Sequence, residues 1–221
     1  MPPPAANAPV LVTDFDGTMS QHDFFKLAIE ELIPGPPRNY WSLYERSEIT
    51  HFEALRRYFA EIRGDESVVR RALKKMEFDP RGGDAIAALR DAGWEVVVAS
   101  AGCRWYIDIL LEDAGIDIRV YANPGRFEAG QGLLMELPPP NFYRSETHGV
   151  DKSAVVRRYL DEGRRVAYAG DGVPDLEPAK LVNEELRFAR SDLADLLRDA
   201  GLGYYPFEHW SEVADRLLKM N

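Results

Sequence analysis

Two pairs of aspartates are the residues best suited to chemistry. Asp14 and Asp16 lie in Asp-Phe-Asp-Gly-Thr, directly after a short apolar run. Asp171 and Asp175 lie in Gly-Asp-Gly-Val-Pro-Asp, after another apolar run. Carboxylates held close together repel one another unless a cation or a reacting group uses their charge. The two pairs together therefore predict a site for a divalent cation and a phosphoryl group, whereas the first segment alone would also fit a solvated turn.

The first pair has the right chemistry for phosphate transfer in two steps. Asp14 is the predicted nucleophile, and its attack on phosphorus would give an acyl phosphate that water then hydrolyses. Asp16 would donate a proton to the leaving group and later take one from the attacking water. That role suits a carboxyl group whose pKa is raised by neighbouring negative charge. Gly17 would allow a sharp turn out of the strand, and Thr18 would hydrogen-bond that turn.

Three further positions are predicted to bind the phosphoryl group. Ser100 ends an apolar run and is followed by Ala101, so its hydroxyl and the next backbone N–H groups would bind a phosphoryl oxygen. The alternative is that Ser100 only caps the following helix. Lys152 stands just before an amphipathic helix and would neutralise both Asp14 and the phosphoryl group, although lysines are commonly solvated surface charges.

The four aspartates are also the predicted metal ligands. Hard oxygen donors favour Mg²⁺, which keeps several waters and needs few protein ligands. Asp14 and Asp171 would bind through their side chains, and Asp16 through its backbone carbonyl. Asp175 would bind through water or brace the loop, and it could also serve as the N-cap of the next helix.

Four more side chains are candidates for substrate contacts. His22 and Asp23 follow the first motif and would face the substrate, or would simply begin a solvated helix. Arg56 or its neighbour Arg57 would reach a substrate carboxylate or phosphate, although most such arginines are solvated. The same two alternatives apply to Arg104.

A parallel sheet would bring these residues together. Short apolar runs alternate with helical patterns, which favours an α/β fold: a Rossmann-like, doubly wound parallel sheet with helices on both faces. The predicted strands are Val10–Asp14, Glu95–Ser100, Ile118–Tyr121, Val166–Gly170 and Leu186–Ala189. The predicted helices of this core are Gly82–Ala92, Cys103–Ala114, Lys152–Glu162, Asp175–Asn183, Asp192–Ala200 and Glu208–Lys219. Ligands bind beyond the carboxyl ends of such strands, where Asp14, Ser100 and Asp171 stand.

About eighty residues separate the first two predicted strands, far more than a crossover needs. They read as helices over His22–Ile33, Asn39–Ile49, His51–Ile62 and Glu66–Glu77. Pro34-Gly35-Pro36-Pro37 separates the first two of these helices, and Thr50 with Glu53 forms a capping box for the third. We therefore predict a small helical cap over residues 20–79, inserted after the first strand of a core formed by 1–19 and 80–221. Such a cap would exclude water and select the substrate. A β-hairpin is predicted within Val120–Leu137.

Composition limits the remaining possibilities. The 221 residues carry a net charge of −10, which disfavours nucleic acid or an anionic membrane as a partner. No apolar stretch approaches the ~20 residues of a membrane helix. Cys103 is the only cysteine, so no intrachain disulfide can form and a cytoplasmic location is favoured. Its thiol is expected to be packed rather than nucleophilic. Met1–Pro9 reads as a short disordered tail rather than a signal peptide.

In order, the Asp14 motif, Ser100, Lys152 and the Asp171 motif resemble the four motifs of the haloacid dehalogenase superfamily. The resemblance covers nearly the whole chain, and the insertion is similar to the cap of the phosphoserine phosphatase-like branch. The segments 186–193 and 203–208 are similar to methionine-salvage hydroxy-keto-methylthiopentenyl-phosphate phosphatases. The resemblance implies a Rossmann-like core, Mg²⁺ dependence, an aspartyl-phosphate intermediate and the residue roles given above.

The sequence departs from the phosphoserine phosphatases at several positions. Gly17 stands where they frequently have serine, and Asp23 where they tend to have glutamate. Ser100-Ala101-Gly102 replaces their usual Ser-Gly-Gly. The leading hypothesis is therefore a Mg²⁺-dependent phosphatase of a small phosphorylated metabolite, with the metabolite open. The alternatives are a phosphotransferase, in which another hydroxyl replaces water, and a non-catalytic phospho-receiver or binding domain.

Overall fold

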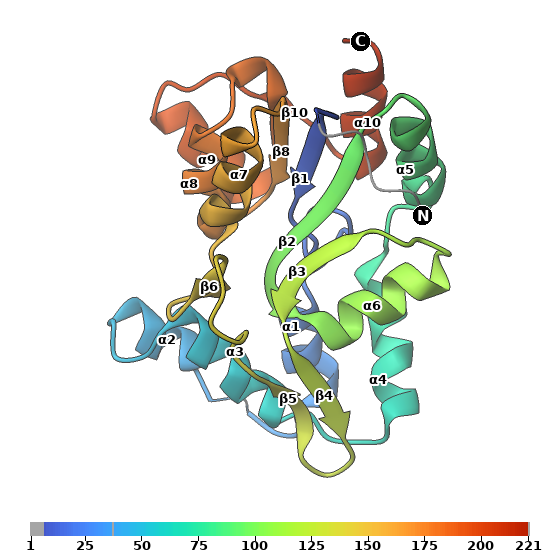
Figure 1. Ribbon diagram of the computed structural model, residues 1–221. Coiled ribbons are helices and arrows are strands. Elements are labelled where there is room, and N and C mark those ends of the chain that lie inside the picture. Colours follow the sequence, from blue (N-terminus) through green and yellow to red (C-terminus); the bar gives the residue numbers. More distant parts are fainter. Residues whose placement is uncertain (1–6, 37, 221) are drawn as a thin grey trace.

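A six-stranded parallel sheet forms the centre of the computed structural model, which describes residues 7–36 and 38–220 (Figure 1). The strand order is β10-β9-β8-β1-β2-β3, and every hydrogen-bonded pair in it is parallel. The strands are β1 (Val10–Thr13), β2 (Glu95–Cys103), β3 (Arg119–Asn123), β8 (Val166–Gly170), β9 (Arg187–Ala189) and β10 (Tyr205–Pro206). The predicted α/β fold is confirmed.

Two short antiparallel pairs accompany the sheet: β4 (Gly125–Glu128) with β5 (Gly132–Met135), and β6 (Arg144–Ser145) with β7 (Gly149–Val150). The first of them confirms the predicted hairpin. The α-helices are α1 (Phe24–Leu27), α2 (Tyr40–Glu45), α3 (His51–Ala60), α4 (Glu66–Leu73), α5 (Gly82–Asp91), α6 (Arg104–Asp113), α7 (Lys152–Asp161), α8 (Leu176–Lys180), α9 (Ser191–Asp199) and α10 (Trp210–Leu218). The other helical segments are the π-helix η1 (Ala28–Leu32) and the 3₁₀ turns η2 (Lys74–Met76), η3 (Val173–Asp175) and η4 (Glu184–Leu186).

Burial on both faces explains why the strand sequences are continuously apolar. Successive side chains of a strand point to opposite faces. In β1, Val10 and Val12 belong to the core cluster that contains buried residues of α7, α8 and α9. Leu11 belongs to the cluster that contains buried residues of α5, α6 and α10. Figure 1 shows these two sets of helices on opposite sides of the sheet. Each position of such a strand must therefore be apolar.

The segment between β1 and β2 begins and ends at the same place. Ser20 and Phe78 form an isolated antiparallel bridge, and the Asp79 N–H donates to the Met19 carbonyl at 3.0 Å. Figure 1 shows α1, α2 and α3 beyond one end of the sheet. This arrangement supports the division at residues 20 and 79, which we keep as a proposal.

The insertion does not form a separate hydrophobic core. Its buried residues belong to the same cluster as buried residues of β2 and α6. Helix α3 also packs closely on β5. A Cβ added at Gly132 would lie only 2.5 Å from the Phe59 carbonyl oxygen, which is too close for a carbon atom.

Several predicted elements end elsewhere. The first insertion helix divides into α1 and the π-helix η1. The second ends at Glu45, shortly before Ser47, whose left-handed backbone conformation stops a helix. The fourth, α4, ends at Leu73 and continues as the 3₁₀ turn η2 to Met76, where the left-handed conformation of Glu77 ends it. Strand β2 continues past Ser100 to Cys103, so α6 begins one residue later than predicted. The two-residue strand β10 carries too short a pattern to have been predicted.

The predicted N-terminal tail is only partly described. Residues 1–6 lie outside the described residues, as does Pro37 of the predicted linker. The prediction of disorder is wrong for Ala8 and Pro9. The Ala8 carbonyl accepts from Arg164, and the Pro9 carbonyl accepts from the Glu95 N–H. Among the described residues, the helices are all too short or too polar to cross a membrane.

Candidate active site

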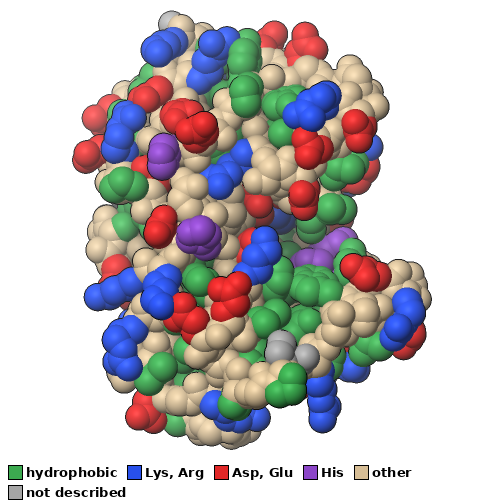
Figure 2. Space-filling model, turned by 180° about the vertical axis from the view of Figure 1, so that it is seen from behind, with side chains coloured by type: hydrophobic (Ala, Val, Ile, Leu, Met, Phe, Trp, Pro, Cys, Tyr) green, Lys and Arg blue, Asp and Glu red, His purple; other side chains and the backbone are tan. Residues whose placement is uncertain are grey.

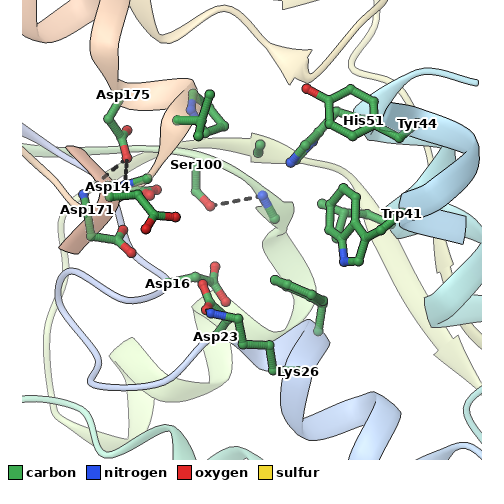
Figure 3. Close-up of a pocket in the computed structure, with 18 of the residues that line it drawn as sticks. Asp14, Asp16, Asp23, Lys26, Trp41, Tyr44, His51, Ser100, Asp171 and Asp175 are labelled. Carbon is green, nitrogen blue, oxygen red and sulfur yellow. Dashed lines mark hydrogen bonds and ion pairs between the residues drawn. The ribbon is translucent and has the colours of Figure 1, made fainter. Parts of the chain in front are cut away.

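The carboxyl ends of β1, β2 and β8 open into a cavity of about 410 Å³. The sheet side of this cavity carries Asp14, Asp16, Ser100, Ala101, Lys152, Asp171 and Asp175, so the structure brings together the predicted catalytic, phosphate-binding and metal-binding residues. The insertion supplies the other side from α1, α2 and α3. Figure 3 shows Asp14, Asp171 and Asp175 close to one another, with Trp41, Tyr44 and His51 across the cavity.

Three of the aspartates could hold a divalent cation. Carboxylate oxygens of Asp14, Asp171 and Asp175 lie within 4.8 Å of one another. Burial is the main cause, and the charge of Asp175 the second, of raised pKa values at two of them. The pKa of Asp14 lies well above its ordinary value, and the pKa of Asp171 is raised to about 7. Both carboxyl groups are thus crowded without enough positive charge, a condition that a bound cation would relieve. The all-oxygen donor set fits a hard divalent metal ion.

Lys152 supplies part of the missing positive charge. Its Nζ lies 2.9 Å from Asp14 Oδ2 and 2.6 Å from Asp175 Oδ1, and the side chain is buried. Burial alone would lower the pKa of Lys152, but the two carboxylates hold it above its ordinary value. Asp151 fixes this lysine at the first position of α7, because its side chain accepts from the Ala154 N–H and caps the helix. The ammonium group is therefore held beside the predicted nucleophile.

Asp175 braces the loop that carries Asp171. Its Oδ2 accepts from the Gly172 N–H at 2.9 Å and from the Asp171 N–H at 3.2 Å. Its Oδ1 accepts from Lys152 and from the Tyr168 hydroxyl. Asp175 stands at the N-cap position of α8, as the sequence allowed, but its side chain makes no cap bond to that helix. Both of its oxygens already have protein partners, so Asp14 and Asp171 are the carboxylates with more freedom to bind a metal directly.

Asp16 is held in a fixed orientation beside Asp14. Its Oδ1 accepts from the Phe24 N–H at 3.0 Å, and its Oδ2 accepts from the Tyr106 hydroxyl at 2.7 Å. Burial raises the pKa of Asp16 to about 6, although the Tyr106 hydrogen bond acts in the opposite direction. A carboxyl group with such a pKa can give and take a proton near neutral pH. Gly102 makes room for this contact, since a Cβ there would overlap the Tyr106 hydroxyl.

Ser100 lies in the cavity wall but does not cap a helix. Its Oγ accepts from the Gly102 N–H at 2.9 Å, and the N-cap position of α6 is Cys103. The helix-capping alternative is therefore wrong, whereas phosphate binding by Ser100 and Ala101 stays a prediction. Cys103 is buried, and burial raises the pKa of its thiol to about 12, so the thiol is a poor nucleophile, as expected.

Of the four candidates for substrate contacts, Asp23 alone lines the cavity. His22 is exposed, with its Nε2 3.8 Å from Glu77 Oε2. Arg104 pairs with Asp108 at 3.0 Å. These positions correct the expected contacts of His22 and Arg104, because both side chains point to acids outside the cavity.

Arg56 also lies away from the cavity. Helix α3 presents His51, Leu55 and Phe59 to the cavity, at the spacing of one helical face. Arg56 and Arg57 fall on another face, where both pair with Glu53. The expected contact of Arg56 with the substrate is corrected for this reason.

The sequence did not single out several residues that line the cavity. Trp41 and Tyr44 lie three residues apart on α2, and Lys26 follows Asp23 by three residues and pairs with it at 2.5 Å. The spacing alone indicates a shared helical face, but such a face is equally typical of a buried core. Tyr106 carries no sequence signal, because its contact with Asp16 joins residues ninety positions apart.

One backbone hydrogen bond joins the insertion to the loop before Lys152. The Phe52 N–H, at the start of α3, donates to the Thr147 carbonyl at 2.8 Å. The neighbouring rings of His51 and His148 lie with centroids 5.1 Å apart. The two sides of the cavity therefore meet at this point.

Gly17 occupies a position of the first motif that has no space for a side chain. Its φ is +69°, and an added Cβ would overlap the carboxylate of Asp171. Replacement of Gly17 by Ala is expected to lower the free energy of unfolding by about 2 kcal/mol or more, because left-handed backbone alone costs an L-residue roughly 1–2 kcal/mol. It should also lower kcat by displacing Asp171. Urea denaturation and steady-state kinetics measure the two effects.

Gly115→Ala is the matched control. Gly115 has a φ of +67° but open space around its Cα. In this variant the free energy of unfolding should fall only by the cost of placing an L-residue in the left-handed conformation, and kcat should be unchanged. Equal effects of the two substitutions would show that the contact with Asp171 is unimportant.

Comparisons with known proteins agree with this geometry. The family model of the haloacid dehalogenase-like hydrolases matches residues 11–180. A 2-hydroxy-3-keto-5-methylthiopentenyl-1-phosphate phosphatase of Bacillus velezensis is 24% identical over 208 residues, which are 93% of this chain and 88% of that protein. A phosphatase of the same name from Exiguobacterium sibiricum is 23% identical over 222 residues, 94% of this chain and 95% of that one.

Solved structures show the same fold. A substrate-bound phosphoserine phosphatase superposes with a TM-score of 0.65 at 16% identity, over 97% of this chain and 98% of that one. A phosphoserine phosphatase with an analogue of the phospho-aspartyl intermediate superposes with a TM-score of 0.63 at 17% identity, over 95% and 98% of the two chains. Because the family model covers well over half of the sequence, the chain belongs to the haloacid dehalogenase-like hydrolase family, as its motifs predicted.

Proposed function

We propose that this protein is a Mg²⁺-dependent phosphatase that hydrolyses the monoester of a small phosphorylated metabolite through an aspartyl-phosphate at Asp14. Phosphomonoester hydrolysis agrees with the family and with the phosphatases among the relatives. The observation that carries the proposal is the position of Asp14: it lies in one cavity with Asp16, a proton donor, and 2.9 Å from the Lys152 ammonium.

The proposed reaction has two steps. A carboxylate oxygen of Asp14 forms a bond to phosphorus, the ester P–O bond breaks, and the Asp16 carboxyl group gives its proton to the leaving oxygen. Water then attacks the phosphorus of the acyl phosphate, its proton passes to Asp16, and the bond to Asp14 breaks. Lys152 and Ser100 would hold phosphoryl oxygens throughout both steps.

Asp14, Asp171 and the Asp16 carbonyl would hold the Mg²⁺ ion. When bound, the ion would neutralise negative charge that Lys152 leaves uncompensated. We prefer Mg²⁺ to a softer metal because all the available ligands are oxygens.

We also propose a cytoplasmic location and a metabolite substrate rather than nucleic acid. The single cysteine suits a reducing compartment. The net charge of −10 and a cavity of about 410 Å³ suit a small molecule better than a polyanion.

Phosphate release from p-nitrophenyl phosphate tests the function. The purified protein should release phosphate with Mg²⁺, lose that activity in excess chelator, and regain it when Mg²⁺ is restored. The melting temperature should also rise at saturating Mg²⁺, because the ion binds the folded protein and relieves the carboxylate repulsion. Full activity in chelator, or an unchanged melting temperature, would contradict the metal role. No turnover with any phosphate monoester would overturn the proposed function.

A further inference from the structure

The insertion side of the cavity is an aromatic wall formed by Phe25, Trp41, Tyr44 and His51. The ring centroids of Trp41 lie 5.1 Å from Phe25, 5.6 Å from Tyr44 and 5.2 Å from His51. Rings this close are packed against one another, with no space for a group between them. The planes of these rings stand at 48° to 77° to that of Trp41, so the wall presents ring faces and ring edges together. Aromatic or conjugated groups make stacked and edge-to-face contacts with such a wall.

His51 has an unmet hydrogen-bonding need within this wall. Its Nδ1 is buried without a hydrogen-bond partner among the described residues. Burial, together with the neighbouring His148, lowers the pKa of His51 to about 3, so its ring is neutral and has one donor and one acceptor. Buried polar atoms are rarely left unpaired. Because the ring lines the cavity, a bound molecule can supply the missing partner (Figure 3).

The charge of the cavity selects against further anionic groups. Apart from Lys152 and the four aspartates of the proposed metal and catalytic site, the described residues that line it include three carboxylates, Asp23, Glu45 and Asp192, against one lysine and no arginine. Lys152 is paired with Asp14 and Asp175, and Lys26 with Asp23. Glu45 lines the cavity from α2, next to Tyr44, and forms no ion pair among the described residues. Neither lysine is therefore free to pair with a substrate carboxylate, and the described part of the cavity lining offers no other lysine or arginine.

An exposed apolar side chain also lines the cavity beside the aspartates. Val173, in the loop between Asp171 and Asp175, is 59% exposed and lines the cavity. Figure 2 shows hydrophobic side chains gathered in a hollow on one face of the molecule, with acidic and histidine side chains beside them. Exposed apolar surface of this kind favours an apolar partner.

We propose that the substrate is a phosphate monoester whose leaving group is uncharged and flat, an aromatic ring or a conjugated chain, and bears one polar group that hydrogen-bonds His51. The inference rests on the proposed phosphatase function and narrows its substrate class. Esters of carboxylate-bearing alcohols, such as amino-acid phosphates, are poor substrates on this basis.

Matched benzyl esters test the shape and charge of the leaving group. Benzyl phosphate and cyclohexylmethyl phosphate are both esters of primary alcohols, so both leaving groups are primary alkoxides. Only the ring of the benzyl ester is flat and aromatic. We expect kcat/KM to favour benzyl phosphate by about 3- to 10-fold, the range of an aromatic contact. It should favour benzyl phosphate over 4-carboxybenzyl phosphate by about 10-fold or more, because like charges repel. Equal or reversed preferences, or a preference for 4-(aminomethyl)benzyl phosphate, would overturn the proposal.

Two variants assign these preferences to the wall. Trp41→Leu should abolish the preference for benzyl over cyclohexylmethyl phosphate, whereas Phe142→Leu should keep it, because Phe142 is an exposed aromatic outside the cavity. Glu45→Gln should improve 4-carboxybenzyl phosphate relative to benzyl phosphate. Unchanged ratios in both variants would contradict the role of the wall.

A third variant tests the hydrogen bond. At least one of the three (hydroxymethyl)benzyl phosphates should be a better substrate than benzyl phosphate for the wild type, and His51→Phe, which keeps a ring, should lose that preference. If no isomer is preferred, or if the preference survives in His51→Phe, this part of the proposal is wrong.

Acetyl phosphate separates failure of the inference from failure of the function. It has a good leaving group and no ring, so it reports the chemistry of Asp14 alone. Hydrolysis of acetyl phosphate and equal hydrolysis of all the esters would contradict the inference and leave the proposed phosphatase function standing. Inactivity toward acetyl phosphate and every ester would remove both.

Discussion

Replacement of Asp14 by Asn is expected to lower kcat by about 10,000-fold or more, because the amide has no charged oxygen to attack phosphorus. The wild type should also leave a phosphate covalently bound to Asp14 after rapid acid quenching, and the variant should not. Steady-state phosphate release and mass spectrometry of the quenched protein measure the two results.

Stability provides the control for this variant. Asp14 is buried among other carboxylates, and its pKa is raised by that burial and by Asp175. Removal of its charge should therefore leave the melting temperature unchanged or higher, since Lys152 keeps its pair with Asp175. Retention of even a few per cent of wild-type turnover by a folded Asp14→Asn protein would exclude Asp14 as the nucleophile.

Replacement of Asp16 by Asn should have an effect that depends on the leaving group. An alkoxide needs a proton as it departs, so hydrolysis of alkyl phosphates should slow by about 100- to 10,000-fold. p-Nitrophenolate leaves without a proton, so the first step should survive and the second, which needs a base, should not. Stopped-flow absorbance should then show a burst of p-nitrophenolate, about one equivalent per enzyme, followed by slow turnover.

Asp108→Asn is the control for Asp16. Asp108 is a carboxylate on α6, two residues from Tyr106 in the sequence, and it pairs with Arg104 outside the cavity. Its loss should change neither the burst nor the rates with alkyl phosphates. If Asp16→Asn slows alkyl and nitrophenyl esters equally in the first step, Asp16 is a structural residue and not the proton donor.

Much of the fold could be predicted because burial restricts which residue types occur in a short stretch of sequence. Strands covered on both faces must be apolar throughout, and five such strands were recognised from that pattern. Their ends were less certain, since a strand can continue through Ser100 to Cys103 without changing its pattern. Helix ends depended on single backbone conformations, such as the left-handed one at Ser47, which sequence does not specify for a serine.

The sheet side of the candidate site could be predicted for a related reason. Asp14, Ser100 and Asp171 lie at or close to the carboxyl ends of strands, so the sheet alone brings them together. The half of the cavity that the insertion forms could not. Its residues come from short helices whose orientation depends on packing. Helix α3 turns the face with His51 toward the cavity and the face with Arg56 away from it, and the sequence does not specify that orientation.

The hydrogen bond between Phe52 and Thr147 constrains how reaction products can depart. An outward swing of α3 must break this bond or pull Thr147 along, and Thr147 stands five residues before Lys152. Thr147 cannot follow freely, because the next carbonyl, that of His148, accepts from the Asn123 side chain at 3.2 Å, and Gly149 and Val150 pair with Ser145 and Arg144. The insertion is therefore tethered to the core at one end of the cavity, and the products of the proposed reaction would leave past another part of its rim.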